Sequence, residues 1–101
     1  MTMLEKNVVK LYCDYRMRGQ VAIRTEEKAD EEGNEKKAIQ AFETRVECFS
    51  AAEKILNRLM VHIDNKTVIE CIEEFNAWVK DEYCNDVIRE IEIPYCFLCK
   101  H

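Results

Sequence analysis

The residues of this chain best suited to chemistry lie in the run Cys96-Phe-Leu-Cys99-Lys-His101. Two cysteines separated by two residues are a common half of a structural zinc site, because this spacing lets both thiolates reach one tetrahedral ion. One such pair supplies only part of the ligand set. The sequence therefore predicts a zinc site whose other ligands come from elsewhere, and the alternative is a pair of thiols without a metal.

Four further cysteines and a second histidine are available to complete this site: Cys13, Cys48, Cys71, Cys84 and His62. The last predicted element should return toward the start of the second predicted helix. This places His62 and Cys71 near the tail, so the predicted zinc ligands are Cys96, Cys99, His62, Cys71 and His101. Cys13 and Cys48 lie on apolar faces and are interpreted as core thiols. Core burial is the competing interpretation of Cys71, and a simple hydrogen bond that of His62.

Motifs of known enzymes are missing from the sequence. Two glycines cannot form a phosphate-binding loop, and neither G-x-S-x-G nor H-E-x-x-H occurs. A redox function of Cys96 and Cys99 is disfavoured, since no helix follows whose N-terminus would lower a thiol pKa. We therefore expect a binding protein rather than an enzyme.

Size and charge narrow the class of partner. The 101 residues are 48% hydrophobic, which predicts a single domain over residues 1–101. The 20 acidic and 15 basic residues give a net charge of −5. This balance disfavours direct binding to nucleic acid, which depends on Lys and Arg at phosphates. It suits a protein partner with a basic surface.

The N-terminal residues and the hydropathy indicate a cytoplasmic protein. Charges at Glu5, Lys6, Lys10 and Asp14 interrupt the first 20 residues, so no signal peptide is expected. No segment approaches the ~20 apolar residues that span a bilayer, so no membrane contact is predicted. Cysteines in a reducing compartment are expected as thiols or metal ligands.

The pattern of apolar residues predicts an α+β fold. Alternation at Val9, Leu11, Cys13 and Tyr15 is typical of a strand. The predicted strands are 7–15, 20–25, 37–48 and 87–95, and the predicted helices are 50–63, opened by a capping box at Ser50, and 67–83. Between the second and third strands, residues 26–37 are expected as a solvated loop or hairpin tip centred on Gly33 and Asn34. The order β-β-β-α-α-β predicts an antiparallel sheet of about four strands with a two-helix hairpin packed on one face.

Acidic side chains gather on the outer face of the second predicted helix and in the 26–37 segment. The candidate partner-binding residues are Glu70, Glu73, Glu74, Asp81, Glu31 and Glu32. Such a surface can imitate a phosphate backbone and fill a basic groove, and the alternative is a solvated helix face. Tyr12, opposite Cys13 on the first predicted strand, is a candidate exposed aromatic anchor.

In its size, its acidity and its Cys96-Phe-Leu-Cys99 element, the chain resembles small phage-encoded inhibitors of the type II anti-CRISPR kind, some of which bind zinc. The resemblance implies stoichiometric inhibition of Cas9, a nuclease with a basic nucleic-acid channel, in the host cytoplasm. The zinc would then be structural. The alternative function is a small intracellular regulatory or sensor domain that binds a metabolite or a metal.

Elemental analysis tests the predicted zinc site. Protein purified without chelator should carry about one zinc ion per chain, and its melting temperature should fall sharply after chelation, because a structural site contributes directly to folding. If the protein is metal-free and its melting temperature does not respond to chelator, the zinc prediction is wrong and all six cysteines are core or surface thiols.

Overall fold

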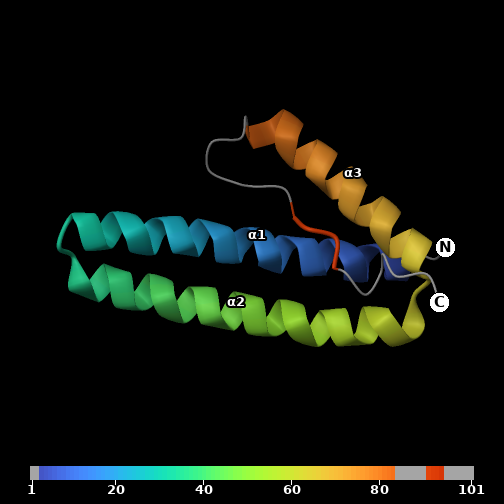
Figure 1. The fold of residues 1–101 in the computed structure, drawn as a ribbon, viewed down its shortest axis with the longest axis horizontal. Helices are drawn as coiled ribbons and strands as arrows, with labels where there is room; N and C mark the ends of the chain where they lie inside the picture. The colour runs from blue at the N-terminus through green and yellow to red at the C-terminus, as the bar shows by residue number, and fades with distance from the viewer. Residues whose placement is uncertain (1–2, 84–90, 95–101) are drawn as a thin grey trace.

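A computed structural model describes residues 3–83 and 91–94, with side chains for 5–59, 63–81 and 91–94. Its helices are α1 (Met3–Glu31), α2 (Glu35–His62) and α3 (Asn65–Tyr83). Figure 1 shows α1 and α2 side by side as a long hairpin, with α3 returning over the N-terminal half of α1. The segment 91–94 runs between α3 and the hairpin (Figure 1). Among the described residues, no third helix lies beside the half of the hairpin nearest its tip.

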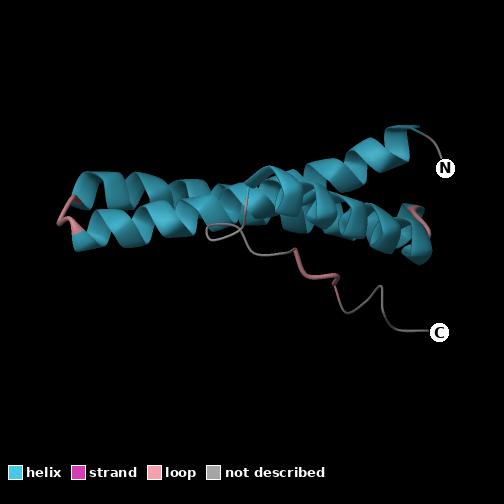
Figure 2. Cartoon of the chain, turned by 90° about the horizontal axis from the view of Figure 1, so that it is seen from above, coloured by secondary structure: helices cyan, strands magenta, loops and turns pink. Residues whose placement is uncertain are grey.

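The predicted α+β class is wrong, because the described residues contain helices and no strand (Figure 2). The predicted strands 7–15 and 20–25 lie within α1, and 37–48 lies within α2. Of the predicted strand 87–95, residues 91–94 have no regular secondary structure and the others lie outside the described residues. The chain is rich in Glu and Lys and has one Pro and two Gly, so helices continue where the strand interpretation required turns.

The burial pattern of α1 shows why alternation was misleading. Residues four apart share a face in both a strand and a helix, so Val9 and Cys13 fit either structure. The intervening residues distinguish them: Tyr12 is 4% exposed, whereas Leu11 is 46% exposed. Burial at positions i, i+3 and i+4 is the helical pattern. The prediction of Tyr12 as an exposed anchor is therefore wrong.

The turns between helices are set by local side-chain chemistry. Gly33 adopts a φ of +71°, a left-handed conformation that favours glycine, and the Asn34 side chain accepts from the Lys37 amide at 3.2 Å. The predicted hairpin tip thus reverses the chain, although it connects helices. Asp64 accepts from the Thr67 amide at 3.4 Å, close to the predicted break before 67–83. The capping box at Ser50 does not open a helix, since Ser50 lies inside α2.

A heptad repeat on α2 forms what we call the α1–α2 seam. Positions at alternating spacings of three and four residues point toward α1: Ala38, Ala41, Arg45, Cys48, Ala52, Ile55 and Leu59. Near the tip the buried partners on α1 are also small, namely Gly19, Ala22 and Ala29. Small side chains bring helix axes close together, so this half of the hairpin packs without a large core.

The larger core lies at the other end, where all three helices meet. Val9, Leu59, Val68 and Ile72 are fully buried there, and Ile91 of the 91–94 segment is 3% exposed. This cluster is the main apolar stabilisation of the fold, since burial of each such side chain contributes about 1.5–3 kcal/mol. It attaches α3 and residue 91 to the hairpin.

Substitution of Gly19 tests the closeness of the seam. A Cβ at Gly19 would lie 2.5 Å from Cε1 and Cζ of Phe49, so one helix or the ring must move. Gly19→Ala should lower the free energy of unfolding by roughly 1–3 kcal/mol, although alanine in an open helix position raises it by about 1 kcal/mol. Chemical denaturation measures the change. A stabilised Gly19→Ala would contradict this packing, and Phe49→Leu should rescue the variant.

Candidate functional site

The outer face of α3 carries an acidic stripe with a tryptophan inside it. Glu70, Glu74, Trp78 and Asp81 follow at spacings of four, four and three residues, which places them on one helix face. All four are exposed, and Trp78 remains 46% exposed. Glu73 is exposed beside them. The position of Trp78 between Glu74 and Asp81 was the signal in the sequence that could have shown its exposure.

Trp78 forms one end of a groove between α1 and α3. Its ring lies against Phe75, with centroids 5.6 Å apart and planes tilted by 52°. The groove has a volume of about 680 Å³ and is lined by Asn7, Lys10, Leu11, Asp14, Cys71, Glu74, Phe75 and Trp78. This volume falls within the range of about 300–1,000 Å³ typical of small-ligand sites.

The charges around the groove determine which groups it can accept. Asp14 pairs with Arg18 at 2.9 Å on an exposed part of α1, and Lys10 is the cation among the lining residues. Glu74 adds a carboxylate on the α3 side, next to Trp78. An exposed indole beside carboxylates attracts Lys or Arg side chains, through cation–π contact and ion pairing together.

Two buried thiols lie at this groove: Cys71 lines it, and Cys13 lies next to Cys71 in the core. Burial raises the pKa of Cys13 from 9.0 to about 12, and the neighbouring Cys71 and Asp14 add to the rise. The pKa of Cys71 is also raised, first by burial and then by Glu74. The core interpretation of Cys13 and of Cys48 is confirmed, since both are buried. Cys71 is buried as well, in agreement with its competing interpretation as a core residue.

The predicted zinc ligands are only partly within the described structure. Among the described residues, no three His, Cys, Asp or Glu side chains lie close enough together to hold a metal ion. His62 is the last residue of α2 and its side chain lies outside the description, as do Cys96, Cys99 and His101 entirely. The zinc site therefore stays a prediction that depends on the tail.

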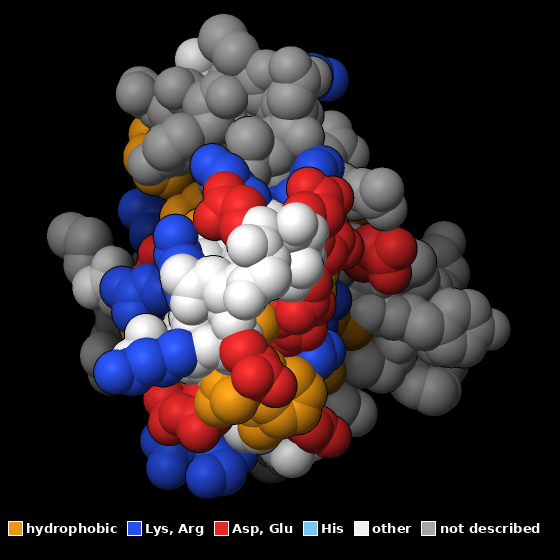
Figure 3. Space-filling model, turned by 90° about the vertical axis from the view of Figure 1, so that its left-hand side faces the viewer, with side chains coloured by type: hydrophobic (Ala, Val, Ile, Leu, Met, Phe, Trp, Pro, Cys, Tyr) orange, Lys and Arg blue, Asp and Glu red, His pale blue; other side chains and the backbone are white. Residues whose placement is uncertain are grey.

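The remaining predicted partner residues lie at the hairpin tip. Glu31 ends α1 and Glu32 occupies the turn, and both are exposed. Figure 3 looks onto this end, where acidic and basic side chains surround the turn and apolar side chains lie beside them. In Figure 1 the tip lies at one end of the hairpin, away from α3. The six predicted acidic residues thus form two groups, one on α3 and one at the tip.

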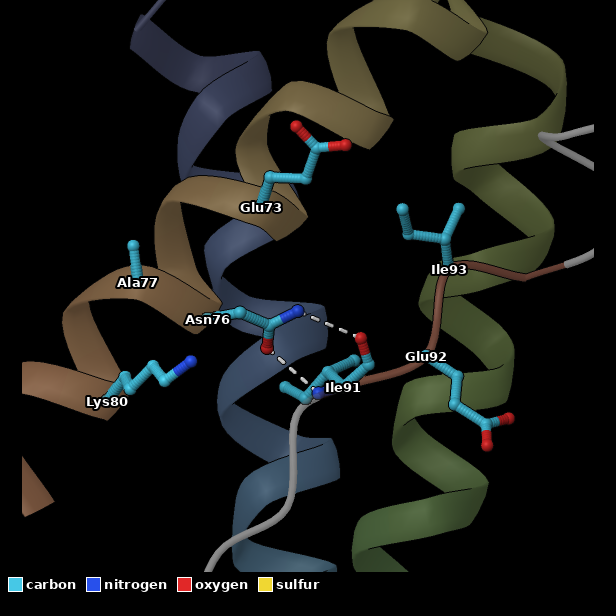
Figure 4. A pocket seen from close by; sticks show the side chains of 7 residues that line it. All are labelled: Glu73, Asn76, Ala77, Lys80, Ile91, Glu92 and Ile93. Atoms are coloured by element: carbon cyan, nitrogen blue, oxygen red, sulfur yellow. Dashed lines mark hydrogen bonds between the residues drawn. The ribbon is translucent and has the colours of Figure 1, made fainter. Parts of the chain in front are cut away.

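A second hollow on α3 is formed with residues 91–94. Asn76 holds this segment through both ends of its amide, donating to the Ile91 carbonyl at 3.0 Å and accepting from the Ile91 amide at 2.8 Å (Figure 4). The hollow, about 630 Å³, is lined by Glu73, Asn76, Ala77, Lys80, Ile91, Glu92 and Ile93. Satisfying both backbone groups of a buried residue fixes the segment in place.

Comparisons with protein-family models, with curated proteins and with solved structures found no match to this chain. Within the described residues, no helix has the length together with the apolarity needed to cross a membrane. The candidate site therefore rests on the geometry of α3 and its groove.

Alkaline unfolding tests the environment of Cys13. The unfolded thiol ionises near 9.0 and the folded one near 12, so stability contributed by the protonated thiol is complete below pH 9.0 and is lost as pH rises toward 12. Between about pH 9 and 10.5, wild type should lose roughly 2 kcal/mol more free energy of unfolding than Cys13→Ala. Val9→Ala truncates a neighbouring buried side chain without removing a titrating group. Over the same pH range, this variant should lose as much free energy of unfolding as wild type.

Proposed function

We propose that this protein acts by binding, as an inhibitor that occupies a basic surface of a nucleic-acid-handling enzyme, and that Cas9 is the first candidate target. The half-exposed Trp78 within the acidic stripe of α3 carries the proposal. In this proposal the protein is phage-encoded, works in the host cytoplasm and keeps a structural zinc through its tail cysteines. It needs no catalytic residue, because occupancy of the enzyme's binding surface is sufficient for inhibition.

The chemistry of α3 supports a basic protein partner. Glu70, Glu74 and Asp81 offer carboxylates about one and two helical turns apart, at a pitch of about 5.4 Å. Trp78 lies between them and supplies the large apolar contact typical of interface hot spots. A net charge of −5 would speed association with a basic surface and make it sensitive to salt. Nucleic acid itself would be repelled.

A cleavage assay with purified Cas9–guide complex tests the target and the surface together. Wild-type protein should reduce DNA cleavage near equimolar amounts, and added salt should weaken the effect. Trp78→Ala and Glu74→Lys should each raise the inhibitory concentration by roughly tenfold or more, because each removes a contact at the centre of the surface. Glu53→Lys, the same charge change at an exposed position of α2, is the matched control.

The outcomes test separately whether Cas9 is the target and whether α3 is the binding surface. Undiminished cleavage at a large molar excess would exclude Cas9. Inhibition by wild type that Glu53→Lys weakens as much as Glu74→Lys would show a general effect of net charge and would remove α3 as the binding site. Retained inhibition by Trp78→Ala would remove the aromatic anchor.

A second candidate function is a regulatory or sensor domain that takes a metabolite into the α1–α3 groove. The size of the groove and its mixed lining of Phe75, Leu11 and Lys10 favour it. Glu70 belongs to the acidic stripe but does not line the groove. Leu11 lines the groove but does not belong to the acidic stripe. A ligand that raises the melting temperature of Glu70→Lys but not of Leu11→Ala would support this function, and the reverse pattern would contradict it.

A further inference from the structure

The two walls of the α1–α3 groove run in the same direction. Both helices begin at the end of the molecule marked N, so residue numbers increase the same way along each wall (Figure 1). Lys10 therefore lies toward the start of the groove, whereas Asp14 and Trp78 lie toward its other end. Glu74 lines the α3 wall one helical turn before Trp78. The Trp78 end of the groove thus combines an indole with two carboxylates.

This end of the groove is suited to a cation. Glu74 is exposed, and it takes no part in an ion pair with any other described residue. Asp14 pairs with Arg18 through Oδ2, which leaves its second carboxylate oxygen outside this ion pair. A cation placed against the indole would meet favourable charge from both walls, because one carboxylate belongs to α1 and the other to α3.

The chain already holds one guanidinium in surroundings of this kind. The guanidinium carbon of Arg18 lies 5.7 Å from the ring centroid of Tyr15, while Nη2 donates to Asp14 at 2.9 Å. An aromatic ring and a carboxylate thus bind one planar cation together. A guanidinium is weakly hydrated and has five donors, so it can stack on a ring and bond to carboxylates at the same time. The lysine ammonium is a strongly hydrated point charge, so the Trp78 end favours arginine over lysine.

The spacing of side chains along α1 fits the length of one arginine residue. Four helical residues separate Lys10 from Asp14, which is a rise of about 6 Å. The extended arginine side chain reaches roughly the same distance from Cα to its guanidinium carbon. With the guanidinium at Trp78, the alkyl stem would lie along Leu11 and Phe75, which also line the groove. The ligand's main-chain carbonyl would then face Lys10, which can donate to it.

The open form of the groove favours a protein as the source of this arginine. Lys10, Glu74 and Trp78 are all exposed, whereas small-molecule sites bury most of their ligand. The volume of about 680 Å³ also exceeds that of one amino acid and leaves room for residues on either side. We propose that the groove binds an arginine side chain of the protein partner, with its guanidinium against Trp78 and between Glu74 and Asp14. This inference rests on the proposed binding of a basic partner and names the group that the groove takes.

Tryptophan fluorescence tests the groove directly, because Trp78 is the only tryptophan of the chain. The full chain is titrated with three blocked peptides, acetyl-Gly-X-Gly-amide, in which X is arginine, lysine or citrulline. The arginine peptide should change the emission saturably with a dissociation constant on the order of 1 mM, as expected for a single anchored side chain. The lysine peptide should bind about threefold or more weakly, and the uncharged citrulline isostere about tenfold or more weakly.

Two variants of adjacent residues test the position of the guanidinium. Glu74→Gln removes a carboxylate of the groove and should raise the dissociation constant of the arginine peptide about fivefold or more. Glu73→Gln is the matched control, since Glu73 is also exposed on α3 but lines the hollow at Asn76 instead. This control should leave binding unchanged. Acetyl-tryptophan-amide titrated with the same peptides measures non-specific stacking and should not saturate.

Four results bear on the proposal beyond the expected one. Equal binding of the arginine and citrulline peptides would overturn it, and so would equal weakening by Glu74→Gln and Glu73→Gln. Free arginine that binds about tenfold more tightly than the blocked peptide would overturn the protein source and assign the groove to a metabolite. If the arginine peptide does not bind although wild type inhibits Cas9, the groove proposal fails and the proposed function stands. Saturable arginine binding without inhibition of Cas9 would support the groove and exclude that target.

Discussion

The close packing of α1 on α2 is the constraint on which the other features depend. Gly19 lies against the ring of Phe49, and alanines fill the seam toward the tip. This closeness lets the two helices run together without large side chains, and α3 then packs where the seam widens into a core of Val9, Leu59 and Ile72. The groove beside Trp78 exists only because α3 is held there. Disruption of the seam would therefore affect both the fold and the candidate site.

The molecule separates its surfaces by charge. The stripe on α3 is acidic around an exposed indole, whereas α2 exposes the apolar side chains of Ile39, Phe42 and Val46 toward the hairpin tip.

The cysteines divide between core and tail. Cys13, Cys48 and Cys71 are buried, and burial raises the pKa of Cys13 and Cys71. The predicted zinc site stays a prediction, because Cys96, Cys99 and His101 lie outside the described residues. The clamp of Asn76 on Ile91 is relevant here, since it fixes the chain five residues before Cys96.

The sequence by itself determined the points where local chemistry is decisive. Gly33 and Asn34 reverse the chain, the helix over 67–83 ends at Tyr83 within α3, and the apolar surroundings of Cys13 and Cys48 marked them as core thiols. Only the tertiary structure decided the fold class, because residues four apart share a face in a strand and in a helix. It also exposed Trp78 and buried Tyr12, since the position of α3 across α1 determines which side of each helix meets water. The pairing of Asn76 with Ile91 joins residues 15 apart, and no local pattern announces such a contact.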